Sequence, residues 1–140
     1  MTNDPLNIAR FAGPLHALLR VMTALTFMSH GTMKLLGFPH MPAMPGHPPM
    51  PAPPLLSLFG VAGMLELAGG ALVLVGLFTR PVAFLLAGEM AIAYGLVHAH
   101  GGLVPATNMG ESAYLFCFIF LWLAAAGSGP FACDASDKIS

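Results

Sequence analysis

Ionisable side chains lie inside the long apolar stretches of this sequence, and they are the residues best suited to acid–base chemistry. The first stretch, residues 15–36, carries Arg20, His30 and Lys34. On a helix these three side chains fall within a sector of roughly 80°. A charge in the hydrocarbon core of a bilayer costs from roughly 3 to more than 10 kcal/mol, which makes such residues candidates for function. We expect this polar stripe to face other helices or water.

Later apolar stretches supply the matching acids and imidazoles. Depths of about 1.5 Å per residue from the helix ends predict two charge groups. In one group Arg20 meets Glu89 or Glu66, and in the other Lys34 meets Glu111 or Glu66. The expected proton-transfer residues are His30, Lys34, Glu66, His98 and Glu111. The expected ligand-binding residues around them are Arg20, Glu89, His100, Tyr114, Phe118 and Trp122.

Each of these residue types also has a purely structural explanation. The two cations of the first stretch can extend to opposite membrane interfaces. Glu66 and Glu89 can be neutral carboxyls hydrogen-bonded across helices. Glu111 can be the third residue of a capping box that begins at Asn108. The aromatic side chains of the last stretch can be packing residues instead of a platform for a ring.

The composition indicates which elements position these groups. The chain of 140 residues is 56% hydrophobic and 8% charged, whereas soluble domains have about 25% charged residues. A net charge of −1 gives no reason to expect a nucleic-acid partner. We therefore predict an all-α, four-transmembrane-helix bundle in contact with the lipid bilayer, forming a single membrane domain over residues 1–140. The expected helices are about 15–36, 55–78, 81–100 and 110–126.

The distribution of Lys and Arg predicts the orientation of the bundle. Arg10 and Arg20 belong to the N-terminal end, Arg80 to the connection between the second and third helices, and Lys138 to the tail. The other two connections contain neither Lys nor Arg, although Lys34 borders the first of them. The positive-inside rule therefore predicts cytoplasmic N- and C-termini, and a multi-pass protein of a bacterial-type inner (plasma) membrane.

The connection at residues 37–54 has a composition of its own, rich in Pro, Met and His. Its prolines favour an extended, polyproline-like chain. Thioether and imidazole groups suit copper, so the loop is either a metal-handling segment or a proline-rich spacer. The weak metal-ligand candidates are His40, Met41, Met44, His47 and Met50. Because residues three apart lie roughly 9 Å apart in such a chain, we expect weak copper binding or none.

Four motifs in order along the chain resemble those of the DoxX-like family of small membrane proteins. They are R-x9-H-G-x-x-K at 20–34, G-x-x-E-L-x-G-G at 63–70, G-L-F-T-R at 76–80 and N-x-G-E at 108–111. The likeness covers about 15–127. It implies a four-helix membrane protein linked to oxidoreductase systems. Some relatives are described as subunits of a thiosulfate:quinone oxidoreductase, and others are associated with thiol-redox and oxidative or metal stress functions.

Two functions follow as hypotheses. The first is a redox-associated subunit that binds a quinone or a small sulfur compound among the outer helix ends, which lie on the side of the membrane opposite the predicted cytoplasmic termini. A soluble or membrane oxidoreductase would be its partner. The sequence contains no haem motif, iron–sulfur cysteine set or dinucleotide-binding glycine loop, so we expect no covalent cofactor and at most a diffusible quinone. If the chain is catalytic, it is a quinone-linked oxidoreductase subunit. The second is a non-catalytic membrane partner or metal-stress protein that uses the Pro/Met/His loop. A homo-oligomer is compatible with both.

Overall fold

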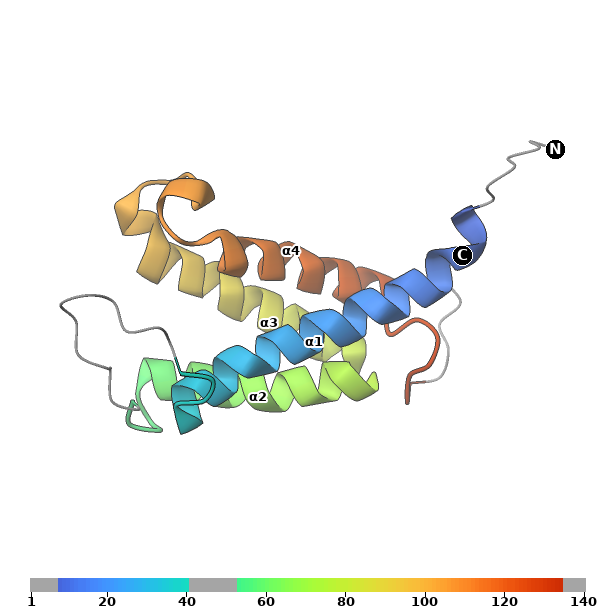
Figure 1. Cartoon of the computed structure of the whole chain (residues 1–140), viewed down its shortest axis with the longest axis horizontal. Coiled ribbons are helices and arrows are strands. Elements are labelled where there is room, and N and C mark those ends of the chain that lie inside the picture. Colours follow the sequence, from blue (N-terminus) through green and yellow to red (C-terminus); the bar gives the residue numbers. More distant parts are fainter. Residues whose placement is uncertain (1–7, 41–52, 135–140) are drawn as a thin grey trace.

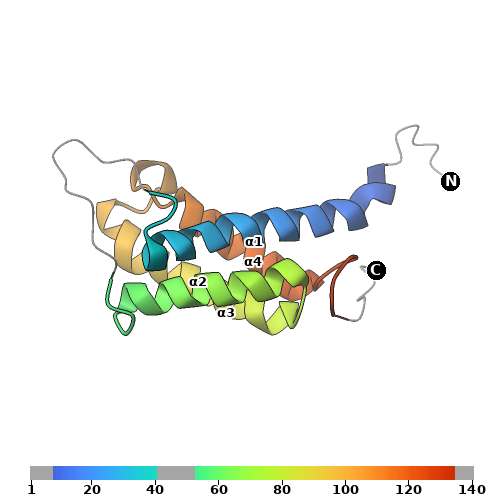
Figure 2. The same cartoon turned by 60° about the horizontal axis from the view of Figure 1, so that its bottom comes forward.

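Four antiparallel helices form the structure, a computed structural model that describes residues 8–40 and 53–134 (Figure 1). They are α1 (Ala12–Leu36), α2 (Leu58–Val75), α3 (Thr79–Ala93) and α4 (Glu111–Ala126). No strand occurs in these two ranges. The start of α1 and residues 131–134 lie at one end of the bundle, here called the termini end, and the end of α1 and the start of α2 lie at the opposite, loop end (Figure 2). The predicted all-α four-helix class is confirmed.

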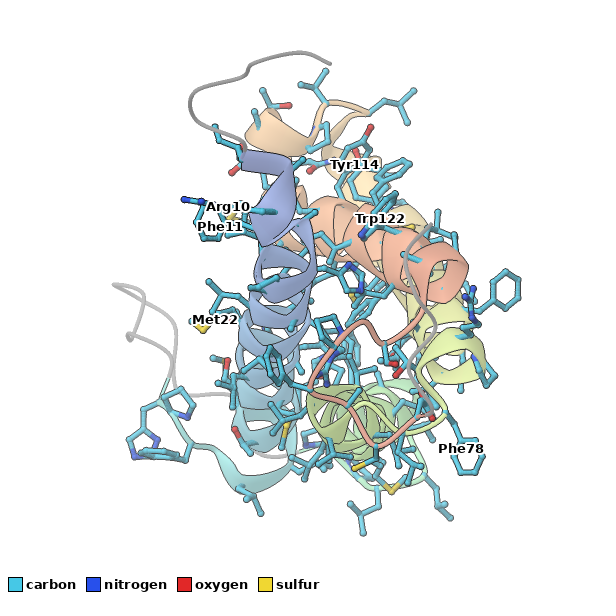
Figure 3. All side chains as sticks on the ribbon, turned by 90° about the vertical axis from the view of Figure 1, so that its right-hand side faces the viewer. Arg10, Phe11, Met22, Phe78, Tyr114 and Trp122 are labelled. Carbon is cyan, nitrogen blue, oxygen red and sulfur yellow. The ribbon has the colours of Figure 1, made fainter. Side chains whose placement is uncertain are left out.

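Three of the helices are long and apolar enough to cross a membrane. They are the segments Ile8–Leu36, Leu58–Val75 and Thr79–Gly101. The fourth, α4, is apolar but has 16 residues and is therefore about 24 Å long, shorter than a hydrocarbon core of about 30 Å. Large apolar side chains such as Met22 and Phe78 point away from the bundle (Figure 3). The chain is a multi-pass membrane protein whose outer surface meets lipid.

Helix α2 is shorter than the predicted 55–78 because local capping residues end it at both sides. Ser57 is its N-cap, and the Ser57 hydroxyl accepts the N–H of Gly60 at 3.1 Å. Gly76 follows the last residue with a φ of 68°, the left-handed conformation that glycine adopts without strain. The helix therefore presents its carboxyl end to the termini end of the bundle.

Helix α3 starts earlier and changes form earlier than the predicted 81–100. Its regular part ends at Ala93, and a π-helical turn (Tyr94–His98) and a 3-10 turn (Ala99–Gly101) continue it. A π turn adds one residue to the helix, which rotates everything beyond it. The side chain of His98 consequently lies beside the 103–110 connection, where its Nδ1 is 3.1 Å from the carbonyl oxygen of Asn108.

The helices pack most extensively as two pairs, α1 with α2 and α3 with α4. Phe27 of α1 joins the pairs in the centre, where it is completely buried. Its ring meets Phe116 and Phe120 of α4 edge-on, with centroid distances of 5.2 and 4.7 Å. Edge-to-face pairs at such distances stabilise a core beyond the burial of their area.

Arg20 connects α1 to the carboxyl end of α2 and to the chain after α4. Its guanidinium donates hydrogen bonds to the carbonyl oxygens of Val73 at 2.8 Å, Leu74 at 2.6 Å and Phe131 at 2.8 Å, and its residue is 1% exposed. The guanidinium thus bonds to backbone carbonyls, not to the expected Glu89 or Glu66. The last turn of a helix has no following turn of N–H donors, and the negative end of its dipole attracts the cation. The Val73 oxygen additionally accepts the N–H of Gly76 at 3.1 Å.

Residues after α4 complete the termini end by pairing with the α2–α3 connection. The N–H groups of Cys133 and Asp134 donate to the carbonyl oxygens of Val75 and Gly76 at 3.0 and 2.7 Å. The Asp134 carboxylate then accepts the N–H groups of Phe78 and Thr79, each at 2.8 Å. Helix α3 has no capping side chain of its own at Phe78, so Asp134 acts as its cap from across the fold.

The environment of Asp134 lowers the pKa of its carboxyl. Partial burial works in the opposite direction, because desolvation raises the pKa. The hydrogen bonds from Thr79 and Phe78 and the positive charge of Arg20 outweigh this effect. A carboxyl with a lowered pKa stabilises the fold above its ordinary value of 3.8, and this contribution is lost as the pH falls through the folded-state value.

Asp134→Asn should therefore destabilise the protein at neutral pH. An Asn side chain keeps one acceptor oxygen in place of two and lacks the negative charge, which is worth about 0.3–1 kcal/mol at a helix N-terminus. We expect a lower midpoint of thermal unfolding in detergent micelles at pH 7, and a smaller difference from the parent as the pH falls below about 4. A difference that stayed constant between pH 7 and pH 3 would contradict this role of the carboxylate.

Candidate functional site

Helices α1 and α2 come unusually close together near the loop end because glycines face each other. A Cβ atom added at Gly31 would lie 2.8 Å from the backbone nitrogen of Leu67 and 2.9 Å from the carbonyl oxygen of Gly63. No side chain fits at these distances. Small residues at a membrane helix interface allow such backbone contact. The contact brings the next turn of α1 directly over the middle of α2.

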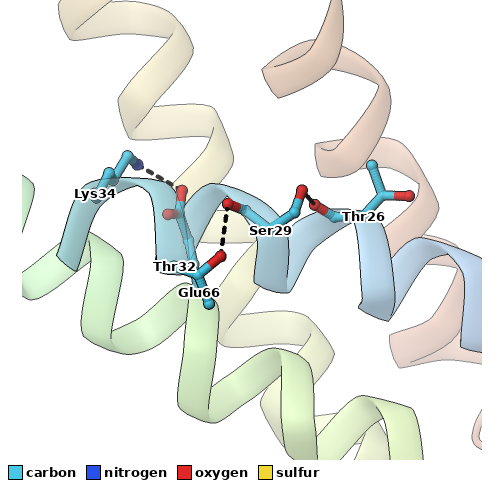
Figure 4. A network of polar contacts seen from close by, with 5 residues as sticks. All are labelled: Thr26, Ser29, Thr32, Lys34 and Glu66. Carbon is cyan, nitrogen blue, oxygen red and sulfur yellow. Dashed lines mark hydrogen bonds and ion pairs between the residues drawn. The ribbon is translucent and has the colours of Figure 1, made fainter. Parts of the chain in front are cut away.

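The close approach places Lys34 on Glu66. The Lys34 Nζ lies 2.6 Å from the Glu66 Oε1, and the two side chains form an ion pair (Figure 4). The Glu66 side chain is 3% exposed and that of Lys34 is 30% exposed. Lys34 thus meets one of its two predicted partners, Glu66. The other, Glu111, lies exposed in the first turn of α4.

A second carboxyl, that of Glu89 on α3, lies near this pair without a hydrogen-bond partner. Both Glu89 oxygens and the Glu66 Oε2 are buried and make no hydrogen bond within the described part of the chain. The charges of Glu66 and Lys34 act on Glu89. In an apolar environment a polar group without a partner costs several kcal/mol. The carboxyl of Glu89 is therefore suited to bind a proton or the hydrogen-bond donor of a ligand.

Lys34 and Glu89 line a groove between α2 and α3, and the volume of this cavity is about 420 Å³. The groove is defined here as the α2/α3 groove. Its polar groups are these two residues. Apolar side chains form most of its walls, among them Phe59, Ala62, Leu65, Phe84, Leu85 and Ile92. Several of these are exposed on the outer surface, so the groove opens sideways toward the lipid. Ligand sites commonly combine apolar walls with a few polar groups.

His30 belongs to a different groove, between α1 and α4. This α1/α4 groove has a volume of about 340 Å³ and shares no lining residue with the first. The His30 ring contacts the Phe116 ring edge-on at a centroid distance of 5.8 Å. His30 was expected in one polar group with Lys34 and Glu66, but it lines a different groove from Lys34.

His98 and His100 lie beyond both grooves, in the connection between α3 and α4. The carbonyl oxygen of Asn108 lies beside His98, and the Asn108 side chain donates to the hydroxyl of Tyr94 at 3.2 Å. The Asn108 Oδ1 accepts the N–H of Gly110 at 2.8 Å. The predicted capping box is wrong, because α4 begins at Glu111 itself and Asn108 folds a turn before it. His100 is exposed.

The aromatic residues Tyr114, Phe118 and Trp122 line neither groove, and each is 42 to 54% exposed. Trp122 has a contact that sequence reasoning missed: its indole N–H donates to the Nδ1 of His16 at 3.2 Å. The His16 Nε2 is 2.9 Å from the carbonyl oxygen of Gly127. Because Nδ1 accepts, Nε2 carries the proton and donates. His16 lies on the same predicted stripe as Arg20 and Lys34, a signal that could have identified it.

The predicted metal-ligand positions Met41, Met44, His47 and Met50 lie outside the described residues. His40 is described and is exposed. In residues 8–40 and 53–134 no three His, Cys, Asp or Glu side chains come together in a way that suits a metal ion. The copper hypothesis for the loop thus stays a sequence prediction.

A double-mutant cycle should show that Lys34 and Glu66 act as a pair. Breaking a buried ion pair by removing one partner costs roughly 3–5 kcal/mol, and the lower value applies here because Lys34 is 30% exposed. Lys34→Met and Glu66→Gln should each lower the free energy of unfolding in micelles. The double variant should lose clearly less than the sum of the two. Additive losses would show that the two side chains act independently.

Comparison with known proteins gives this chain a family. The family model described as DoxX matches residues 15–99. An uncharacterized protein of Haemophilus influenzae is 38% identical over 131 residues, which cover 91% of this chain and 94% of that protein. No solved structure matches. The matched region contains α2, most of α1 and the regular part of α3, and thus the Lys34–Glu66 pair and Glu89. The chain belongs to the DoxX family.

Proposed function

We propose that the α2/α3 groove binds a membrane-soluble quinone or quinol, and that the protein serves as a redox-associated membrane subunit. One observation carries the proposal. Beneath apolar walls that open toward lipid, the groove has a cation with spare hydrogen-bond donors and a buried carboxyl without a partner. A ring with polar oxygens and an apolar tail matches both parts.

The alternative ligand, a small sulfur anion, fits the groove less well. The positive charge of Lys34 is already neutralised by Glu66 at 2.6 Å, and Glu89 adds a further acid nearby. An anion bound there would face two carboxyls and one lysine. It would also have to leave water and enter through apolar walls, where no compensating charge lies. A neutral ring meets neither obstacle.

In this proposal the residues of the chain bind and handle protons. Lys34 has three N–H donors and uses one on Glu66, so another can donate to a ring oxygen. Glu89 holds a proton or accepts one from a hydroxyl, and Glu66 keeps Lys34 positioned. The quinone supplies the capacity to carry electrons. A soluble or membrane oxidoreductase partner supplies or removes them.

Filling the groove should weaken quinone binding strongly without damaging the fold. Gly88 lines the groove, and a Cβ added there meets nothing within 4 Å. Gly88→Leu should weaken the binding of decylubiquinone to the protein in lipid nanodiscs at least tenfold. Gly95→Leu is the matched control, because Gly95 is equally open on the same helical segment but does not line the groove. Equilibrium binding measured after ultrafiltration distinguishes the variants.

Two results would refute the proposal. One is decylubiquinone binding by the parent protein no stronger than by empty nanodiscs. The other is equal binding by Gly88→Leu and Gly95→Leu. Glu89→Gln adds a check on chemistry, since it keeps the shape of the groove but removes the carboxylate. It should weaken binding of the quinol, which donates hydrogen bonds, more than binding of the quinone.

The proposal includes an orientation with the termini end in the cytoplasm of a bacterial cell. Arg10 and Arg80 both lie at this end of the bundle, and Lys34 lies at the other. The positive-inside rule favours the end with more cations. Ser140→Cys in a background without Cys117 and Cys133 should resist a membrane-impermeant maleimide in intact cells and react after lysis. Rapid labelling of intact cells would reverse the orientation.

A further inference from the structure

The α1/α4 groove differs from the α2/α3 groove in its chemistry. Four of its eight lining residues are polar: Thr23, Thr26, His30 and Ser112. The other four are Met22, Leu115, Phe116 and Ile119. It lies between helices that make few contacts with each other, and Met22 and Leu115 are exposed on its outer side. A membrane-soluble molecule can therefore enter it from the side.

Three of its polar side chains have no hydrogen bond to any residue that the structure describes. They are the hydroxyls of Thr23 and Ser112 and the imidazole of His30. The His30 ring makes an edge-on contact with the Phe116 ring. The neighbouring hydroxyls of α1 behave differently. Ser29 donates to the carbonyl oxygen of Thr26 at 2.6 Å, and Thr32 donates to that of Ser29 at 3.1 Å (Figure 4).

This contrast assigns a binding capacity to the groove. A Ser or Thr hydroxyl on a membrane helix can donate to a carbonyl one turn earlier, as Ser29 and Thr32 do, and as Thr26 does to the carbonyl oxygen of Met22 at 2.9 Å. Polar groups without partners in hydrocarbon cost several kcal/mol each. Thr23, His30 and Ser112 leave their capacity free, on two helices that line one groove.

The kind of ligand follows from the absence of charge. No Lys, Arg, Asp or Glu lines this groove. A neutral imidazole offers one donor and one acceptor, and each hydroxyl offers both. An anion or a cation bound there would lack a counter-charge, whereas a neutral hydroxyl would match the donors and acceptors. An apolar chain attached to it would lie against Met22, Leu115 and Ile119.

We propose that the α1/α4 groove binds the head of a neutral membrane lipid, a molecule with an apolar tail and an uncharged head that has a free hydroxyl group. Diacylglycerols and quinols both have this chemistry. His30 and the hydroxyl of Ser112 bind the head, and the apolar side chains bind the tail. Thr23 lies seven residues, and thus about 10 Å, along α1 from His30, so it can donate only to a second oxygen of the ligand. The site does not depend on the function proposed for the α2/α3 groove, because the two grooves share no lining residue.

Photolabelling tests this site directly. The full chain in lipid nanodiscs is irradiated with a photoreactive, clickable diacylglycerol, and the labelled residues are mapped by mass spectrometry. We expect labels on residues of α1 and α4 that line the groove. His30→Leu and Ser112→Ala should each reduce this labelling severalfold. His30→Gln should retain most of it, because the Gln amide offers a donor and an acceptor in place of the imidazole.

Competition identifies the source of the hydroxyl, and the other groove supplies the control. Displacement by unlabelled dioleoylglycerol favours a lipid, and displacement by decylubiquinol favours a quinol. Oleate, an anion with a similar tail, should not displace the photoreactive diacylglycerol. Gly88→Leu, which fills the α2/α3 groove, should leave the labelling unchanged. Labels spread evenly over lipid-facing residues, or full labelling of folded His30→Leu, would overturn the proposal.

Discussion

The backbone contact between α1 and α2 at Gly31 and Gly63 is the constraint on which the rest of the arrangement depends. A lysine in hydrocarbon requires a partner, and the glycines bring α2 close enough for Glu66 to be that partner. Once α1 and α2 form a pair, the second pair packs on them mainly through the buried aromatic rings around Phe27. Grooves remain where the pairs meet, and their polar residues face lipid-accessible space.

Much of the fold could be predicted from the sequence because it depends on local properties. Hydropathy identified the helices, because long apolar stretches are visible in the sequence without knowledge of their neighbours. Lys34–Glu66 was one of two pairings left open by depth along the helices. To choose between Glu66 and Glu111 as the partner of Lys34, one must know where α1 and α2 cross. That crossing point depends on the fit of Gly31 against the backbone of α2.

The sequence predictions fail where a charged side chain has backbone groups at a helix end as its hydrogen-bond partners. Arg20 was expected to meet a carboxylate, but it donates to the carbonyls at the end of α2, where no further helical turn supplies N–H donors. Asp134 was given no role from the sequence, although its carboxylate caps a helix that begins more than fifty positions earlier. The sequence analysis also treated the loop-end polar residues as one set. Depth predicts how far along a helix a residue lies, but it does not predict which groove its side chain enters.

The bonds of Arg20 have a consequence for the order in which the protein is made. Two of its acceptors, Val73 and Leu74, belong to α2, and the third, Phe131, follows α4. During synthesis α1 therefore enters the membrane before the Phe131 carbonyl, the third acceptor of Arg20, has been translated. Once α2 is inserted, Lys34 can pair with Glu66, and Arg20 can bond to two of its three acceptors. The third acceptor becomes available only after α4. Full satisfaction of Arg20 is thus coupled to insertion of the last helix of the bundle and the segment that follows it.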